Sequence, residues 1–150
     1  MNLLMIRPES QLRDFLDSPG EVEEIFQRMK EFYLKVGFEE PWVGYFAQVD
    51  EEIVGSCGFK GGLKDGKLEI AYVTFERYRS KGHATAMCKS LVEMYNHARV
   101  DAELTARTLP EKNYSTRVLE KNGFRKSGII EDHDGEMVWE WIYSLKNFNG

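Results

Sequence analysis

The segment from Arg79 to Ala84 reads Arg-Ser-Lys-Gly-His-Ala and lies between a predicted strand and a predicted helix. The first turn of a helix has backbone N–H groups without intrahelical partners and the positive end of the helix dipole, which suits an anion. Gly82 has no Cβ, so an anion can approach its backbone closely, and Arg79 and Lys81 add positive charge. The segment therefore predicts a turn that holds a diphosphate.

A purely structural explanation of this turn stays open. Gly82 would then only permit a tight connection between strand and helix, and Arg79 and Lys81 would be solvated. Nucleotide sites of other kinds fit less well, because the segment is not GxGxxG and has no Walker lysine-serine pair.

Two longer blocks flank the chemistry of this turn. Residues 69–78, Glu-Ile-Ala-Tyr-Val-Thr-Phe-Glu-Arg-Tyr, lead into it, and residues 113–124, Asn-Tyr-Ser-Thr-Arg-Val-Leu-Glu-Lys-Asn-Gly-Phe, follow later. Together with the turn, they resemble the GNAT superfamily of N-acetyltransferases and are most similar to its branch of ribosomal-protein Nα-acetyltransferase-like enzymes. The resemblance covers about residues 40 to 145, while the first forty residues match only in their helical pattern.

The resemblance implies a mixed, mostly antiparallel central sheet with helices on both faces and one splayed parallel strand pair, here residues 67–75 and 103–108. It implies acetyl-coenzyme A as co-substrate, with its pantetheine arm in the splay, no metal, and direct transfer to an amine. Backbone groups of Val73 and Phe75 would pair with the pantetheine amides, and an N–H of Val73 or Thr74 would point at the thioester carbonyl. The residues expected to contact the cofactor are Val73, Thr74, Phe75, Arg79, Ser80, Lys81, Gly82, His83, Ala84, Thr85 and Asn113.

Acetyl transfer to an amine needs a base for the ammonium, because the protonated amine is not nucleophilic. Glu69 is the first candidate, since strand alternation places it on the same face as Val73; its structural alternative is an exposed or salt-bridged glutamate. Many GNAT enzymes donate a proton to sulfur from a tyrosine at the position of Leu119, which cannot donate. The resemblance points instead to Ser115, with Tyr114 beside it, although Ser115 could equally be a helix N-cap.

The elements that must position these residues follow from periodicity. Strands are predicted over residues 1–8, 42–49, 53–59, 67–75, 103–108, 124–130 and 137–145, and helices over 10–17, 21–36, 81–97 and 115–122. A strand-helix-strand-helix-strand unit that follows an antiparallel meander gives a mixed α/β sheet with helices on both faces. Residues 1–150 are expected to form a single domain.

The composition of the chain limits the kinds of partner that it is expected to bind. The chain has 150 residues, a net charge of -5 and no run that approaches the roughly 20 apolar residues of a membrane span, which argues against nucleic acid and membrane. Cys57 and Cys88 lie in apolar segments and are expected to be buried and unpaired, consistent with a cytoplasmic protein. The acceptor is expected to be a small-molecule or peptide amine, and dimers are a common expectation for such folds.

Two alternatives to an enzyme stay open. One is a coenzyme A-binding module without turnover, which the leucine at position 119 motivates. The other is an α/β scaffold or interaction protein whose Gly82 turn binds nothing.

Overall fold

The computed structural model describes residues 1–15, 20–132 and 134–144. These form one seven-stranded sheet in the order β1-β2-β3-β4-β5-β7-β6. The strands are β1 (Asn2–Met5), β2 (Gly44–Val49), β3 (Glu52–Phe59), β4 (Lys67–Thr74), β5 (Glu103–Thr108), β6 (Phe124–Glu131) and β7 (Met137–Tyr143). The helices are α1 (Gly20–Val36), α2 (His83–Ala98) and α3 (Tyr114–Lys121), with short 3-10 turns at Leu12–Asp14 and Glu76–Tyr78.

The pair β4–β5 is the parallel pair of this sheet, and the other neighbouring strands run antiparallel. Its register begins at Lys67 opposite Glu103 and ends at Ile70 opposite Ala106. β4 continues to Thr74, where it still pairs with β3, and β5 continues to Thr108. The two strands therefore separate beyond Ile70, as expected from the sequence.

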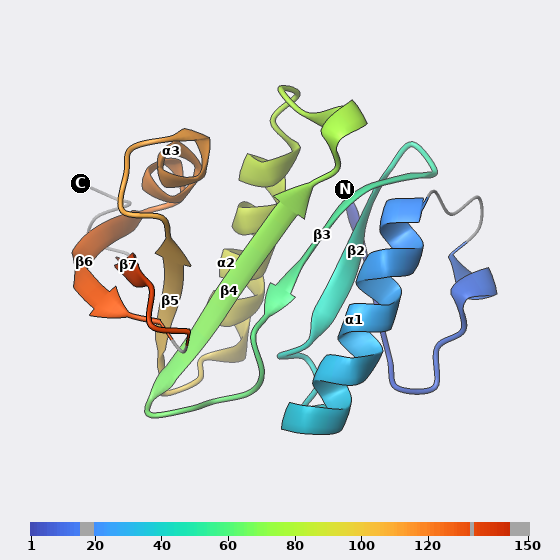
Figure 1. Cartoon of the computed structure of the whole chain (residues 1–150), viewed down its shortest axis with the longest axis horizontal. Coiled ribbons are helices and arrows are strands. Elements are labelled where there is room, and N and C mark those ends of the chain that lie inside the picture. The colour runs from blue at the N-terminus through green and yellow to red at the C-terminus, as the bar shows by residue number, and fades with distance from the viewer. Residues whose placement is uncertain (16–19, 133, 145–150) are drawn as a thin grey trace.

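The helices cover both faces of the sheet. Figure 1 shows α1 in front of the sheet and α2 behind β4. A Cβ added at Gly44 would lie 2.8 Å from the side chain of Met29 in α1, whereas one added at Gly55 would lie 3.2 Å from Met87 in α2. The apolar face of α2 is buried against the sheet and consists of Ala84, Met87, Cys88, Leu91 and Val92.

The element order agrees with the prediction, with small differences at the ends. Residues 10–17 were expected to be helical, but the described part forms only the 3-10 turn Leu12–Asp14. The helix predicted from residue 81 begins at His83, because Gly82 is its N-cap in a left-handed conformation. The last strand ends at Tyr143, and Leu145 lies outside the described residues.

Candidate functional site

The connection from β4 to α2 has an unusual backbone. Ser80 has a φ of 67° and Gly82 a φ of 80°, both left-handed. Glycine adopts this conformation without the steric cost that other residues pay. A Cβ built at Gly82 meets no atom within 4 Å, so the space above this residue is open. The turn is therefore open on the side to which a side chain at position 82 would point.

The amides of this turn remain unpaired. Within the described residues, the backbone N–H groups of residues 81 to 85 donate to no acceptor of the protein, and the first paired amide is that of Ala86, which donates to the carbonyl of Gly82 at 3.1 Å. Arg79 and Lys81 beside them are exposed. A diphosphate fits this arrangement, because unpaired N–H groups at a helix start and nearby cations both favour anions.

A cavity of about 180 Å³ fills the splay between β4 and β5. It is bounded by the ends of both strands and by the start of α3, and its lining includes Tyr72, Ala106, Thr108, Asn113, Ser115 and Leu119. The splay thus provides a slot between two strand edges, the setting in which an extended chain with amide groups can add hydrogen bonds to a strand.

The amide of Phe75 is not available to such a chain. Its N–H donates to the carbonyl of Val54 in β3 at 2.9 Å. Val54 and Phe75 are therefore a hydrogen-bonded pair, and these pairs alternate along antiparallel strands, so the main chain of Val73 faces β3 as well. The expectation that the N–H groups of Val73 and Phe75 face the splay was wrong, because it left out the register with β3.

The alternate residues of β4 face the slot instead. By the same alternation, the main-chain groups of Tyr72 and Thr74 are turned away from β3 and toward the side that β5 leaves open. Of the two expected donors to a thioester carbonyl, Thr74 is thus the one whose N–H has the right direction.

Asn113 caps α3. Its Oδ1 accepts the N–H of Thr116 at 3.1 Å, and the Thr116 hydroxyl accepts the N–H of Asn113 at 3.0 Å. Ser115 is therefore not the N-cap, which the sequence had left open, and it lies inside the helix and lines the slot. Tyr114 is 43% exposed and does not line it. Ser115 is the better placed of the two candidate acids.

Tyr72 reaches across the slot to the start of α3. Its hydroxyl donates to the carbonyl of Ser115 at 3.0 Å. Burial raises the pKa of Tyr72 above its ordinary value, so the hydroxyl stays protonated and keeps donating. This contact links β4 to α3 just where the sheet has opened.

Glu69 lies in a network of ion pairs. Its side chain is 17% exposed, and its carboxylate is 3.4 Å from the Lys60 ammonium and 3.6 Å from Nε of Arg107. Arg107 also pairs with Asp132 at 2.5 Å. The salt-bridged alternative for Glu69 is therefore present in the structure. Arg107 lines the slot, and Lys60 lines a second cavity between α1 and the sheet, so Glu69 lies between these two cavities.

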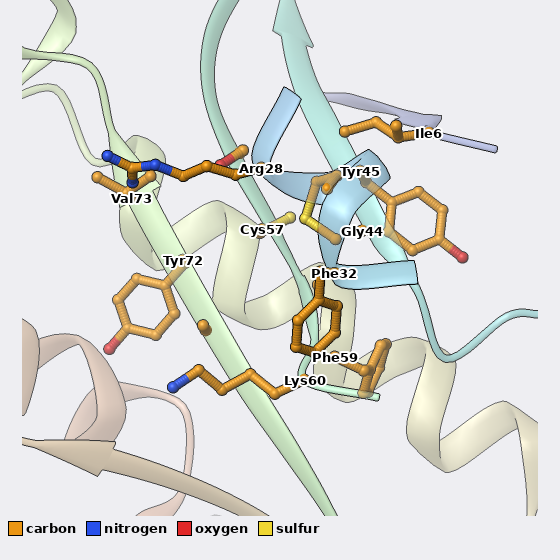
Figure 2. Close-up of a pocket in the computed structure, with 14 residues that line it drawn as sticks. Ile6, Arg28, Phe32, Gly44, Tyr45, Cys57, Phe59, Lys60, Tyr72 and Val73 are labelled. Carbon is orange, nitrogen blue, oxygen red and sulfur yellow. The ribbon is translucent and has the colours of Figure 1, made fainter. Parts of the chain in front are cut away.

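A second cavity, of about 290 Å³, lies between α1 and the sheet. Met29 and Phe32 of α1 form one wall, and Gly44, Gly58 and Ala71 belong to its floor. Figure 2 shows Arg28 extending from α1 toward Val73, and Lys60 extending toward Tyr72. Ala71 and Tyr72 line this cavity and the slot alike, so the two spaces meet at β4.

Cys57 also borders this second cavity, which the sequence analysis did not anticipate. Burial raises the pKa of Cys57 to about 12. Its sulfur is therefore a protonated thiol near neutral pH, and a thiol is a poor nucleophile compared with a thiolate. Cys88 is likewise buried and unpaired, as predicted.

Sequence reasoning missed the side chains that reach the site from outside the two blocks. Arg28 and Lys60 come from segments with no motif, and Arg107 belongs to a strand that was considered only for its backbone. Tyr72 lies inside the first block. The alternation of side chains between the two faces of a strand, which separates Tyr72 from Ala71 and Val73, was the signal that could have identified it.

The described residues contain no group of three or more His, Cys, Asp or Glu side chains that could hold a metal ion. None of the helices in this part of the chain has both the length and the apolar character that crossing a membrane requires.

The chain is similar to two curated proteins that carry the name N-acetyltransferase. N-acetyltransferase YjdG of Bacillus subtilis (strain 168) is 31% identical over 96 residues, which cover 63% of this chain and 54% of that protein. N-acetyltransferase p20 of Bacillus licheniformis is 26% identical over 100 residues, which cover 63% and 56%. Both relatives are uncharacterized, and the chain spans just over half of their length.

Solved structures share the fold. The aminoglycoside acetyltransferase AAC(6')-Ib in complex with coenzyme A and kanamycin superimposes with a TM-score of 0.68 at 18% identity, covering 99% of this chain and 96% of that one. A chimera of spermidine N-acetyltransferase SpeG from Vibrio cholerae and hSSAT gives 0.68 at 15% identity over the whole of both chains. The family model of the acetyltransferase (GNAT) domain matches residues 3–125. The chain therefore belongs to the GNAT acetyltransferase family.

Proposed function

We propose that the protein is an N-acetyltransferase that transfers an acetyl group from acetyl-coenzyme A directly to a primary amine. One observation carries this proposal: a turn with unpaired amides lies at the end of β4, where the splay from β5 has opened a slot. Coenzyme A would place its diphosphate at the turn and its amide-bearing pantetheine chain in the slot. Coenzyme A bound to AAC(6')-Ib, and the names of the curated relatives, support the same ligand.

The amides of residues 81 to 85 would hold the diphosphate, with Arg79 and Lys81 beside them. Ser80 has a left-handed conformation in the turn, and His83, Ala84 and Thr85 begin the helix whose N-terminus would face the phosphates. Main-chain groups of Tyr72 and the carbonyl of Thr74 would pair with the pantetheine amides. Asn113 would act at the far wall by fixing the start of α3.

At the reacting carbon, an N–H donor must stabilise the oxyanion that forms when the amine attacks. The N–H of Thr74 is suited by direction. Glu69 would accept the amine proton through water, because its carboxylate is already held by Lys60 and Arg107. Ser115, on the slot wall, would protonate the departing thiolate, and Tyr114 is the weaker candidate.

The second candidate function is a coenzyme A-binding module without turnover. One observation favours it: Leu119, at the position of the usual tyrosine acid, is fully buried and lines the slot without a proton to donate. A thiolate with a pKa near ~8.5 can leave without an acid, so this absence does not by itself prevent transfer. The finer resemblance, to ribosomal-protein Nα-acetyltransferase-like enzymes, also stays a prediction.

A two-step experiment tests the proposal. Acetyl-CoA at about 100 times its Kd should stabilise the fold by ~2.7 kcal/mol and raise the Tm by roughly 2–6 °C. The purified protein is then offered amino acids, N-terminal peptides, polyamines and aminoglycosides, and the release of free thiol is followed. Thiol release with an acetylated product supports the enzyme. Stabilisation with no product across the panel favours the module, and an unchanged Tm at millimolar acetyl-CoA contradicts both.

A further inference from the structure

The cavity between α1 and the sheet has a charge pattern that selects among amines. Among the described residues that line it, Arg28 and Lys60 carry the formal charges, and both are cations. The rest of the lining is apolar or neutral, including Met29, Phe32 and the thiol of Cys57. A ligand that matches this lining has an apolar body and an anionic group.

The acidic partners of the two cations lie outside the cavity lining. Arg28 pairs with Glu24 one helical turn away, and both side chains are largely exposed, at 67% and 61%. Such exposed pairs contribute little, so exchanging Glu24 for a ligand anion costs little. Lys60 pairs with Glu69 at 3.4 Å, but that carboxylate is shared with Arg107. Both cations can therefore turn to an anion in the cavity.

The cavity, at about 290 Å³, has room for the body of such a ligand. A Cβ at Gly44 would lie 2.8 Å from the Met29 side chain, and one at Gly58 would lie 2.4 Å from the carbonyl of Val43. These two glycines therefore allow α1 to pack closely on β2, and β2 to approach β3, at the edge of the cavity. The floor continues to Ala71, where the cavity meets the slot of the thioester.

We propose that the acceptor is a monoamine of amino-acid type, with an apolar body and a carboxylate or other anionic group held by Arg28 and Lys60. This inference rests on the proposed acetyl transfer and specifies its acceptor. A polyamine or an aminoglycoside would instead bring several positive charges against two cations, which like-charge repulsion disfavours. The cations also disfavour the ammonium form of the bound amine and so favour the nucleophilic, neutral form.

The test compares leucine, leucinamide and isoamylamine, which share an isobutyl group and differ in the anionic group. Spermidine and kanamycin represent the cationic acceptors. We expect kcat/KM, expressed per unprotonated amine, to be roughly 10- to 100-fold higher for leucine than for leucinamide, the range for a charge-assisted hydrogen bond. R28Q and K60Q should each reduce this ratio. K64Q, which removes an exposed lysine of the β3–β4 connection outside the cavity, should leave the ratio unchanged.

The results separate the two proposals. If leucine is not acetylated faster than leucinamide, or if spermidine or kanamycin is the better acceptor, the anionic acceptor is wrong while acetyl transfer stands wherever a product forms. If R28Q and K60Q leave a leucine preference intact, the two cations are not its cause and the inference is overturned. An unchanged Tm with acetyl-CoA contradicts the proposed function itself.

Discussion

The turn around Gly82 and the cavity beside α1 lie along the same strand but are built in different ways. The turn offers backbone amides from one contiguous segment, residues 81–85, and its side chains contribute mainly charge. The cavity is formed by side chains from α1, β2, β3 and β4. Backbone recognition requires only a local conformation, whereas side-chain recognition requires distant segments to meet. The first can therefore be predicted from a short motif, and the second appears only in the folded chain.

The largest expected effect comes from closing the turn. Gly82→Glu places an anion and a bulky side chain in the open space above the amides. We expect the Kd for acetyl-CoA to rise on the order of 1000-fold, because several hydrogen bonds to charged groups are lost together. Isothermal titration calorimetry measures this change.

Gly82→Ala is the matched control, because it imposes the same left-handed strain of φ 80° without charge or bulk. Both variants should lose similar stability, roughly 1–2 kcal/mol, and only the glutamate should abolish binding. Normal acetyl-CoA affinity in Gly82→Glu would show that the turn does not hold the diphosphate.

The junction between the slot and the cavity beside α1 is tested by Ala71→Leu. Ala71 is exposed and lines both cavities, so a leucine fills the passage without disturbing the core. We expect kcat/KM for the acceptor to fall roughly 100-fold, the effect of misplacing reacting groups by about 1 Å. The Kd for coenzyme A should change far less, since the phosphates bind at the turn. Equal losses in turnover and affinity would show that the spaces do not meet where we infer.

Glu69→Gln tests the chemistry on the acceptor side. Its carboxylate is held by Lys60 and Arg107, and we propose that it accepts a proton through water. Turnover should fall on the order of 10- to 100-fold with little change in acetyl-CoA affinity. Asp132→Asn is the control, because it alters the same network through Arg107. Parallel losses of Tm and turnover in both variants would indicate a structural role, and an unchanged pH–rate profile in Glu69→Gln would exclude it as the base.

The smallest effect concerns the thiols near the sheet. Burial raises the pKa values of Cys57 and Cys88 to about 12. The thiols of the folded state thus bind protons more tightly than those of the unfolded state. Their contribution to the free energy of unfolding is complete below about pH 9 and is lost as the pH rises toward 12. Between pH 9 and 10.5, the free energy of unfolding should decline by about 1.5 kcal/mol less in Cys57→Ala than in the unmodified protein. Urea unfolding at both pH values measures it. An undiminished decline would mean that water reaches this thiol in the folded state.

Much of the fold followed from the sequence, because periodicity and turn residues are local signals. The tight strand-to-helix turn at Gly82 was predicted from these signals and is confirmed. The splay of β4 from β5, which the resemblance to GNAT enzymes implied, is also present. The direction of the Val73 and Phe75 amides was not, since it depends on pairing with Val54 and its neighbours in β3, a long-range register.

The acceptor side shows the same limit. Nothing near Arg28 or Lys60 in the chain marks them, and only the packing of α1 on the sheet brings both to one cavity. At α3, Ser115 was the candidate N-cap, but the observed cap is Asn113, whose side chain forms a reciprocal pair with Thr116. A local motif could have suggested this cap, but not which side chain lines the slot.

Backbone amide hydrogen exchange at residues 81–85, with and without coenzyme A, tests the central claim most directly. These N–H groups have no protein acceptor in the described structure and should exchange rapidly in the free protein. Saturating coenzyme A should slow their exchange, while the paired amides of the β2–β3 ladder keep their rates. Exchange at residues 81–85 that is already slow without ligand, or that stays fast at saturation, would contradict the account.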